Sequence, residues 1–401
     1  MKENNILTEK CYECSSCLIS CPVNAIKWKY NSWGSKYAQI DENKCIGCNI
    51  CKKVCPSYNK TEKRTPIVAY AAISKSDQAI ESSSGGIFFE LALEVLERGG
   101  SVIGAAYDKQ WNVKQTVIHD VQKIGRLQGS KYVKSDVADS YKITYELLKK
   151  NKLVLYSGTP CQVGGLQKFI KEPELRENLF TVDIICHGTP PNRLFKSYID
   201  FLMKKKNQKI TRFTFRDKKY GHRHIGSYIL SNGEKQKDIP LYSSESSYFA
   251  LFLQGLIYND TCYTCEYACK ERIGDITLGD FWGIKEEIPT FFKGNELSEE
   301  SSVSAVMVNT KKGERLFEKV KDQLITERTE YERVTRHNPQ LNQPSSCNQE
   351  VRKKLMEAYS KEGYPGIEKY FKENSNYKKY ILRISSYIPA AIKNWIKHVL
   401  R

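Results

Sequence analysis

Two four-cysteine runs near the amino terminus constrain this chain more than any other feature of its sequence. Each run has the spacing C-x2-C-x2-C-x3-C and is followed directly by a proline. Bacterial ferredoxins hold 4Fe–4S clusters with this run. Residues 1–60 are therefore predicted to fold around two such clusters as a ferredoxin-like domain. The cysteines are Cys11, Cys14, Cys17 and Cys21 in the first run and Cys45, Cys48, Cys51 and Cys55 in the second.

The spacing also predicts which cysteines share a cluster. Three cysteines separated by two residues can surround one corner of a cubane, whereas the fourth reaches the neighbouring cluster. A structural zinc site is the alternative, but zinc sites rarely use eight cysteines in two copies of one run. The predicted sets are Cys11, Cys14, Cys17 and Cys55 for one cluster and Cys45, Cys48, Cys51 and Cys21 for the other.

Composition places the chain among ordinary soluble proteins, because 40% of its residues are hydrophobic and 27% are charged. No apolar run reaches the ~20 residues that span a bilayer, and residues 1–10 are polar, so we expect a cytoplasmic protein. In that compartment the fourteen cysteines are expected to be metal ligands or reactive thiols rather than disulfides. Low-potential clusters tolerate oxygen poorly, which favours an anaerobic setting.

The net charge of +17 invites a nucleic-acid interpretation, but the distribution of charge argues against it. Residues 351–401 hold twelve lysines or arginines against four glutamates, so +8 of the charge lies there. From Tyr377 the apolar residues recur at helical spacing, and Pro389 is expected to kink the helix. A basic amphipathic helix can lie on a membrane surface, or it can dock on its own domain or on a partner subunit.

Beyond a polar linker at residues 61–66, predicted strands alternate with predicted helices. Such alternation indicates an α/β or α+β fold with a mostly parallel or mixed sheet covered on both faces. We expect three parts: the ferredoxin domain at 1–60, the α/β domain at 67–310, and a basic helical region at 311–401. The predicted strands are 67–73, 101–107, 153–156 and 179–185, and the predicted helices are 87–98, 141–150 and 194–204.

A second group of cysteines lies in the α/β part. Cys161 and Cys186 each closely follow a predicted strand, at the strand end where α/β proteins usually bind ligands. With Cys262 and Cys265 they supply four thiolates, enough for a third 4Fe–4S cluster. The alternatives are buried inert thiols, a zinc site that includes Cys269, or a nucleophilic Cys161 paired with His187.

Seven short segments, in order, resemble the beta-subunit family of coenzyme F420-reducing hydrogenases and dehydrogenases, in the form with a fused amino-terminal ferredoxin domain. The resemblance runs from about residue 67 to 284 and implies a domain that binds FAD and a 4Fe–4S cluster and passes electrons between them. Some members of that family reduce coenzyme F420. The segments are SSGGIF at 83–88, GSKY at 129–132, SGTPCQ at 157–162, DIICHGT at 183–189, FRDK at 215–218, CYTC at 262–265 and GDITLGDFW at 274–282.

The resemblance assigns candidate FAD contacts. The serines and glycines before the helix at 87–98 suit a pyrophosphate, because glycine lets the backbone approach an anion and a helix amino terminus presents free N–H groups. The alternative is a serine cap on an ordinary helix. The 130–132 segment supplies polar and stacking groups, or else forms a solvated turn. The candidates are Ser83, Ser84, Gly85, Gly86, Ser130, Lys131, Tyr132 and His187.

Several charged residues near these segments allow two interpretations. Arg216 and Lys218 can face an anionic cofactor or only water. Asp275 and Asp280 can form a metal or acid–base pair, but such residues more often cap turns beside glycine. We assign no catalytic residue from the sequence.

The predicted function is that of an iron–sulfur flavoprotein oxidoreductase. It would pass electrons between 4Fe–4S clusters and FAD, and exchange two electrons with coenzyme F420, a nicotinamide or a biosynthetic substrate. The alternative is an electron-transfer subunit without its own substrate, serving a partner oxidoreductase. Expected partners are a redox protein or a small-molecule acceptor, with no nucleic acid.

Overall fold

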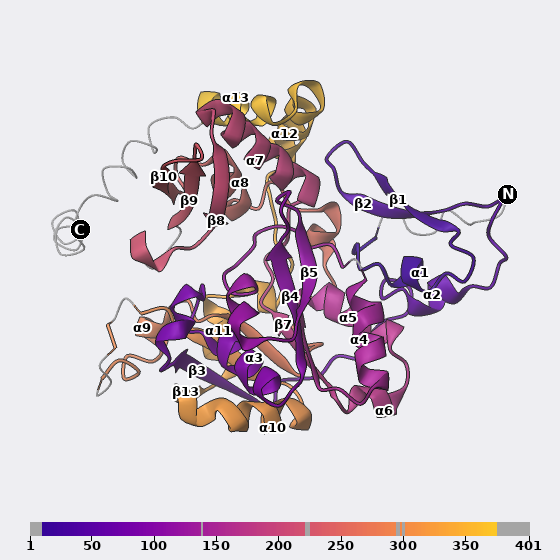
Figure 1. Cartoon of the computed structure of the whole chain (residues 1–401), viewed down its shortest axis with the longest axis vertical. Coiled ribbons are helices and arrows are strands. Elements are labelled where there is room, and N and C mark those ends of the chain that lie inside the picture. The colour runs from indigo at the N-terminus through magenta and orange to yellow at the C-terminus, as the bar shows by residue number, and fades with distance from the viewer. Residues whose placement is uncertain (1–9, 138, 221–224, 294–296, 299–300, 375–401) are drawn as a thin grey trace.

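The computed structural model describes residues 10–137, 139–220, 225–293, 297–298 and 301–374. Its amino-terminal part is a small unit at one side of the molecule (Figure 1). The cysteines Cys17 and Cys55 pack in its core with Ile26, Ala38 and Val54. The elements of this unit are α1 (Ser16–Ile19), β1 (Ile26–Tyr30), β2 (Lys36–Ile40) and α2 (Ile50–Val54), with β1 and β2 in an antiparallel hairpin.

An eight-stranded sheet forms the body of the molecule, in the order β13-β3-β12-β11-β7-β6-β4-β5. The central strands β4, β6, β7 and β11 run parallel, and the others join antiparallel, so the predicted mixed sheet is confirmed. The sheet extends past residue 310, because β13 pairs with β3. The strands are β3 (Val68–Ser74), β4 (Ser101–Tyr107), β5 (Val113–Ile118), β6 (Val154–Gly158), β7 (Leu179–Ile184), β11 (Ile276–Asp280), β12 (Ser304–Val308) and β13 (Leu324–Thr329).

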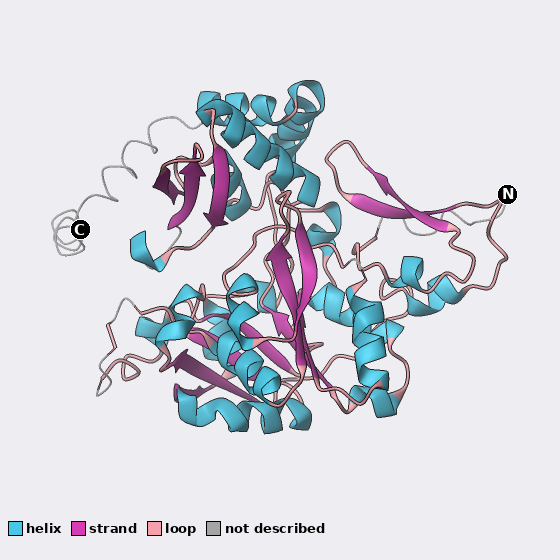
Figure 2. Cartoon of the chain, viewed as in Figure 1, coloured by secondary structure: helices cyan, strands magenta, loops and turns pink. Residues whose placement is uncertain are grey.

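Alternating side chains give the sheet two buried faces. On β12, Val306 and Val308 pack on one face with residues of α3 and α10. Ala305 and Met307 point to the opposite face and pack with residues of α9 and α11. Figure 2 shows the strands with helices around them. The helices are α3 (Ile87–Glu97), α4 (Ser140–Lys149), α5 (Pro160–Phe169), α6 (Pro173–Arg176), α9 (Ile284–Glu287), α10 (Lys311–Val320) and α11 (Tyr331–Arg336).

A second layer of structure stands beside the carboxyl ends of the parallel strands and has its own aromatic core, in which Phe195, Phe213, Phe215 and Tyr248 are buried. It contains a three-stranded antiparallel sheet in the order β10-β9-β8. Its elements are α7 (Asn192–Lys206), β8 (Lys209–Thr214), β9 (Ile225–Ser231), β10 (Gln236–Tyr242), α8 (Ser247–Leu253), α12 (Gln349–Glu362) and α13 (Tyr364–Asn374). Short 3-10 helices are η1 (Asp77–Glu81), η2 (Val121–Arg126), η3 (Lys218–Tyr220), η4 (Asp260–Thr264), η5 (Lys321–Gln323) and η6 (Pro339–Leu341).

The predicted strands at 67–73, 101–107, 153–156 and 179–185 are β3, β4, β6 and β7, and the predicted helices are α3, α4 and α7. The predicted basic helix from Tyr377 lies outside the described residues. Within the described part of the chain, no helix combines the length and apolar character that crossing a membrane requires.

Candidate functional site

The eight amino-terminal cysteines line two separate cavities, four to each. Cys11, Cys14, Cys17 and Cys55 line a cavity of about 280 Å³. Cys21, Cys45, Cys48 and Cys51 line a cavity of about 500 Å³. We call these the first and second cavities. Each contains three cysteines of one run and the fourth cysteine of the other, which is the grouping that the spacing predicts.

The two runs turn in the same way because equivalent residues adopt left-handed backbone. Ser15 and Asn49 each follow a run's second cysteine and precede α1 and α2, with φ of 66° and 58°. Glu13 and Gly47 stand two residues after each first cysteine, with φ of 54° and 73°. Glycine adopts this conformation without strain, whereas for a glutamate it costs about 1–2 kcal/mol. The glutamate at position 13 therefore needs stabilising contacts that a glycine would not need.

A third cavity, of about 590 Å³, lies at the carboxyl ends of β6 and β7 and is lined by Cys161, Cys186, Cys262 and Cys265. Cys161 lies in the first turn of α5, whose start is fixed by a capping box between Thr159 and Gln162.

Two of the three alternatives for these cysteines, the zinc site with Cys269 and the Cys161–His187 pair, are not supported by the contacts. Cys269 is absent from the described lining of the third cavity. Its Sγ instead accepts a hydrogen bond from Lys63 Nζ at 3.2 Å and donates to the Glu271 carbonyl. Cys161 Sγ contacts Lys134 Nζ at 3.2 Å and Thr159 Oγ1 at 3.1 Å. Among described residues it makes no hydrogen bond to His187, so the geometry does not support a nucleophilic Cys–His pair.

Close packing of α5 on the amino-terminal unit brings the first and third cavities together. A Cβ atom at Gly165 would lie 2.8 Å from Cys14 Cβ. Ser16 Oγ donates a hydrogen bond to the Gly165 carbonyl at 2.9 Å. Tyr12 lines both cavities. Glycine at position 165 thus allows the cysteine-bearing unit to reach the sheet's ligand-binding edge.

Burial controls the protonation of these thiols. It raises the pKa of Cys14 and of Cys262 to about 11. It raises the pKa of Cys11 and of Cys265 to about 12. The bare thiols therefore stay protonated at neutral pH, and thiolate ligation requires a bound metal that compensates the buried negative charge. No three His, Cys, Asp or Glu side chains in the described ranges are grouped closely enough to hold a single metal ion.

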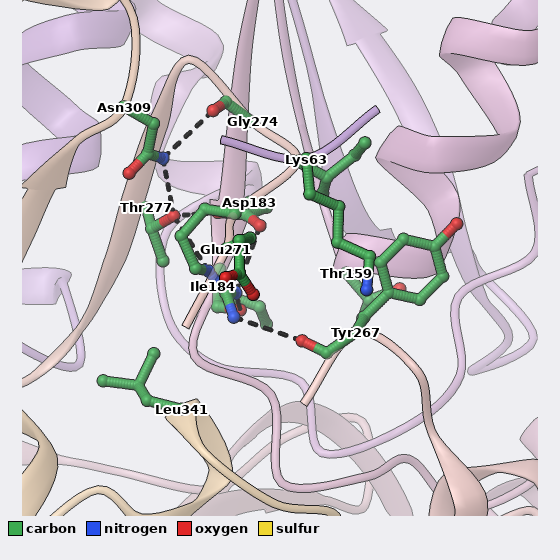
Figure 3. A network of polar contacts seen from close by, with 12 residues as sticks. Lys63, Thr159, Asp183, Ile184, Tyr267, Glu271, Gly274, Thr277, Asn309 and Leu341 are labelled. Carbon is green, nitrogen blue, oxygen red and sulfur yellow. Dashed lines mark hydrogen bonds and ion pairs between the residues drawn. The ribbon is translucent and has the colours of Figure 1, made fainter. Parts of the chain in front are cut away.

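A buried ion pair anchors the loop that carries Cys262 and Cys265. Arg272 Nη2 lies 3.1 Å from Asp183 Oδ2 near the end of β7, and the two side chains are 2% and 0% exposed. Arg272 also donates to the carbonyls of Tyr267 and Cys269. Figure 3 shows the surrounding network, in which Asn309 donates to Thr277 and to the Gly274 carbonyl. The pair fixes the loop against the strand that leads to Cys186.

The third cavity also contains opposite charges from two parts of the chain. Lys134 and Glu13 are both buried and both line it. Burial lowers the pKa of Lys134, but the negative charge of Cys161 and Cys262, when they are ionised, and of Glu13 outweighs it, and the net pKa is raised. Burial raises the pKa of Glu13 to about 7, although Lys134 and Lys36 oppose that rise.

Three of the predicted flavin-contacting segments converge in the structure. Ser130 N donates to Ser83 Oγ at 2.6 Å. Lys218 Nζ donates to the Ser84 carbonyl at 2.9 Å. Residues from SSGGIF, GSKY and FRDK therefore meet, although they are far apart in sequence.

The serines and glycines have structural partners in this arrangement. Ser84 Oγ donates to the Val303 carbonyl, and Gly85 N donates to Ser304 Oγ. A Cβ at Gly85 would lie 2.4 Å from the Ala72 carbonyl oxygen. The residue before α3 is Gly86, with φ of 84°, so the helix has no serine cap. Gly85 thus serves close packing on β3 and β12, whether or not an anion binds nearby.

Three cations surround this convergence. The Lys131 ammonium donates to the Gln128 carbonyl, and burial lowers its pKa to about 7. Burial and the neighbouring Arg216 lower the pKa of Lys218 to about 8. Neither lysine forms an ion pair with a carboxylate in the part of the chain that the structure describes. Arg216 is paired with Asp280 at 2.6 Å. Two cations without acidic partners suit an anionic ligand such as a pyrophosphate.

Tyr132 and His187 lie at the boundary between the two sites. The Tyr132 ring stacks on Phe252 with centroids 4.2 Å apart, so one face of the ring is already covered. Burial lowers the pKa of His187, although Asp280 opposes the shift, so the imidazole is neutral at pH 7.

Asp275 and Asp280 do not form a pair, because they stand at opposite ends of β11. Asp275 Oδ2 accepts hydrogen bonds from Thr181 N and Oγ1, which is a structural role.

Together, a ferredoxin-like unit and a third cysteine-lined cavity on a mixed α/β sheet are the architecture expected of an iron–sulfur protein. Residues 151–333 match the family described as the C terminus of the coenzyme F420 hydrogenase/dehydrogenase beta subunit. Residues 10–59 match the 4Fe–4S dicluster domain. The predicted family resemblance is therefore confirmed over residues 151–333, which contain five of the seven motif segments, and the predicted ferredoxin-type cysteine runs lie in the dicluster match. The segments at 83–88 and 129–132 lie outside the matched ranges.

Individual relatives match over limited parts of their length. The coenzyme F420-dependent sulfite reductase of Methanocaldococcus jannaschii is 26% identical over 163 residues, which cover 39% of this chain and 25% of the reductase. The putative oxidoreductase UacF of Escherichia coli K12 is 42% identical over 48 residues, covering 12% of this chain and 7% of UacF. These matches span a quarter or less of each relative. In the F420-reducing NiFe hydrogenase complex from Methanosarcina barkeri, one chain matches with a TM-score of 0.42 and 18% identity, covering 78% of this chain and 93% of that chain.

Proposed function

We propose that this protein is an iron–sulfur flavoprotein oxidoreductase with three 4Fe–4S clusters and FAD. The observation that carries the proposal is that twelve cysteines line three cavities, four to each. Four cysteine thiolates are the usual ligand set of a 4Fe–4S cluster. The clusters, when bound, supply one-electron transfer, and the flavin supplies exchange of electron pairs with an acceptor. The proposed ligands are Cys11, Cys14, Cys17 and Cys55, then Cys21, Cys45, Cys48 and Cys51, then Cys161, Cys186, Cys262 and Cys265.

The protein itself fixes the positions of the proposed cluster sites. The Gly165 contact holds the first cavity against the third. The Asp183–Arg272 pair holds the loop of Cys262 and Cys265 over β7. Burial of Cys11, Cys14, Cys262 and Cys265 makes their thiolates unfavourable unless metal is bound.

The proposed flavin site is the convergence of Ser83, Ser84 and Ser130 with the cations Lys131 and Lys218. The two ammonium groups are proposed to neutralise the pyrophosphate, since burial makes them costly without an anion. A place next to the third cavity is supported by Asp280, which pairs with Arg216 and also acts on the pKa of His187 in the lining of that cavity. Gly85, Gly86 and Tyr132 are proposed to shape the site by packing.

The proposed acceptor takes two electrons and is coenzyme F420, a nicotinamide or a biosynthetic substrate. The name of the Methanocaldococcus relative makes coenzyme F420 the first compound to assay. That relative is matched over only a quarter of its length, so its substrate does not transfer by itself to this chain.

The test is cofactor content after anaerobic purification. About twelve irons and one FAD per chain support the proposal, whereas about eight irons without flavin would reduce the protein to its ferredoxin unit. Cys262→Ser and Cys269→Ser provide a matched pair on one loop. We expect the first to lose about four irons and the second to retain all of them. Equal iron in the two variants would refute the third ligand set.

A second candidate function is that of an electron-transfer subunit serving a partner oxidoreductase. It is favoured by the surface at the second cavity, where Cys48 is exposed and the neighbouring Ile46 is 64% exposed. The two functions differ in one assay. A reduced protein that is reoxidised by a small two-electron acceptor alone is an enzyme, and one that needs a second protein is a subunit.

A further inference from the structure

The three cysteine-lined cavities differ in charge. Of these three cavities, only the third has lysine or arginine among its described lining residues, namely Lys134 and Arg272. The Arg272 guanidinium is already paired with Asp183. Lys134 differs, because its ammonium contacts Cys161 Sγ directly, at 3.2 Å.

The chain holds Lys134 firmly in this position. The residue is 5% exposed. Its backbone N–H donates to the Pro190 carbonyl at 2.9 Å, and its carbonyl accepts from Asn192 Nδ2 at 3.3 Å. A buried ammonium is unfavourable unless negative charge faces it. Glu13 and the cysteine sulfurs, which become negative when they bind a cluster, are the groups that can supply this charge in the cavity lining.

Glu13 is independent evidence that charged side chains have defined positions at the third cavity. It occupies a left-handed position, with φ of 54°, where the second run has Gly47. Its Oε1 accepts a hydrogen bond from Lys36 N at 3.2 Å, and Lys36 is in turn paired with Asp136. Glu13 and Lys36 belong to the ferredoxin unit, whereas Lys134 and Asp136 belong to the α/β part. The charged groups of the two parts therefore meet at the third cavity.

We propose that Lys134 raises the reduction potential of the cluster at the third cavity, so that this site is the most easily reduced of the three. The inference rests on the proposed function, because it requires a cluster there. Net charge and hydrogen bonds to sulfur set cluster potentials. Reduction adds negative charge, and a cation on a ligand sulfur stabilises the reduced form more than the oxidised form.

The charge of Lys134 favours electron transfer in one direction, toward the third cavity. Lys134 follows the Ser130–Tyr132 segment of the proposed flavin site by two residues. One short segment thus places a cation at the third cavity and polar groups at the neighbouring site. Lys134 is a positioning charge for electron flow from the ferredoxin unit toward the α/β part.

The experiment is a redox titration of the full-length holoprotein, followed by EPR, with iron counted in each sample. Lys134→Met removes the charge and keeps the side-chain length, and Lys134→Arg keeps the charge. Lys168→Met is the control, because Lys168 lies on the same helix as Cys161 but bonds Asn59 at the surface. We expect the reduced-to-oxidised ratio of the third cluster in Lys134→Met to fall about tenfold at a given potential, equivalent to about 59 mV.

The other two clusters should be unchanged in Lys134→Met, and Lys134→Arg should restore most of the shift. An iron-replete Lys134→Met protein with an unchanged third-cluster potential would overturn the inference. If Lys134→Met loses iron, Lys134→Gln replaces it, because glutamine removes the charge but keeps a hydrogen-bond donor. A lowered third-cluster potential in Lys134→Gln would support the inference, and an unchanged potential would overturn it. About eight irons in the unaltered protein would instead overturn the proposed function, and the inference with it.

Discussion

Removal of the Arg272 guanidinium should disrupt the third cavity, because this group anchors the loop that carries Cys262 and Cys265. The group is almost fully buried, and its partner Asp183 has no exposed surface. Its N–H groups are directed at five acceptors, which makes it the organiser of the loop between η4 and β11. The acceptors are Thr277 Oγ1, Asp183 Oδ2 and the carbonyls of Tyr267, Cys269 and Ile184.

The magnitude follows from what Arg272→Met leaves behind. Breaking a buried pair by removing one partner costs about 3–5 kcal/mol, because the remaining charge is uncompensated. Thr277 still donates to Asp183 in the variant, and the carboxyl can take up a proton, which limits the loss. We therefore expect about 3–5 kcal/mol, a large share of the ~5–15 kcal/mol that stabilises a typical domain.

The pH dependence gives the reasoning a second check. Burial raises the pKa of Asp183 even with Arg272 present, and loss of the guanidinium should raise it further. A carboxyl whose folded pKa lies above its unfolded value contributes most at low pH, and that contribution is lost as pH rises through the folded pKa. Arg272→Met should therefore be less destabilised near pH 5 than near pH 8.

The assay is urea denaturation followed by circular dichroism at both pH values, with iron counted in the folded protein. Arg272→Met combined with Asp183→Asn should recover part of the loss, because it removes the stranded charge. If Arg272→Met stays within about 1 kcal/mol of the unaltered protein and keeps all its iron, the pair has no organising role and the argument fails.

Two further perturbations test the docking of the ferredoxin unit and the cationic site. Gly165→Ala should lower stability by about 1–3 kcal/mol through overpacking, because its Cβ would lie 2.8 Å from Cys14 Cβ. Gly125→Ala, whose Cβ meets no described atom closer than 3.8 Å, should be nearly neutral; equal thermal unfolding of the two would contradict the packing argument. The pKa of Lys131 is about 7, so FAD should bind the flavin-depleted protein less tightly as pH rises through 7. Lys131→Met should weaken binding and remove that dependence, as measured by fluorescence titration; an unchanged pH profile would exclude Lys131 from the site.

Much of the fold could be predicted because its signals are local. The strand–helix alternation from residue 67 to 206 corresponds to β3, α3, β4, α4, β6, β7 and α7. The antiparallel edge could not be predicted, because a short strand such as Leu324–Thr329 carries no sign of its partner. Its place beside β3 depends on a contact about 250 residues away in sequence.

The candidate site, like the fold, could be predicted only where its signals are local in sequence. Cysteine spacing predicts the grouping that lines each amino-terminal cavity, since three of the four cysteines in each group lie within seven residues of sequence. The ligand role of each cysteine stays a prediction. Lys134 and Gly165 were missed because their significance comes from the ferredoxin unit packed against them. One local signal was available: Glu13 occupies the position of Gly47 in the repeat, and an unfavourable left-handed glutamate suggests a partner.

That departure from the repeat also explains why the two runs are not equivalent. The second run presents Cys48 and Ile46 to solvent, and a Cβ added at its Gly47 would meet no described atom within 4 Å, so the surface there is open. The first run faces inward, where Glu13 meets the charges of the α/β part. Among the described lining residues, Tyr12 is shared by the first and third cavities, whereas the second cavity shares none with either of them. Under the proposed function, the shared Tyr12 therefore makes the first cavity the expected point of electron transfer between the ferredoxin unit and the α/β part.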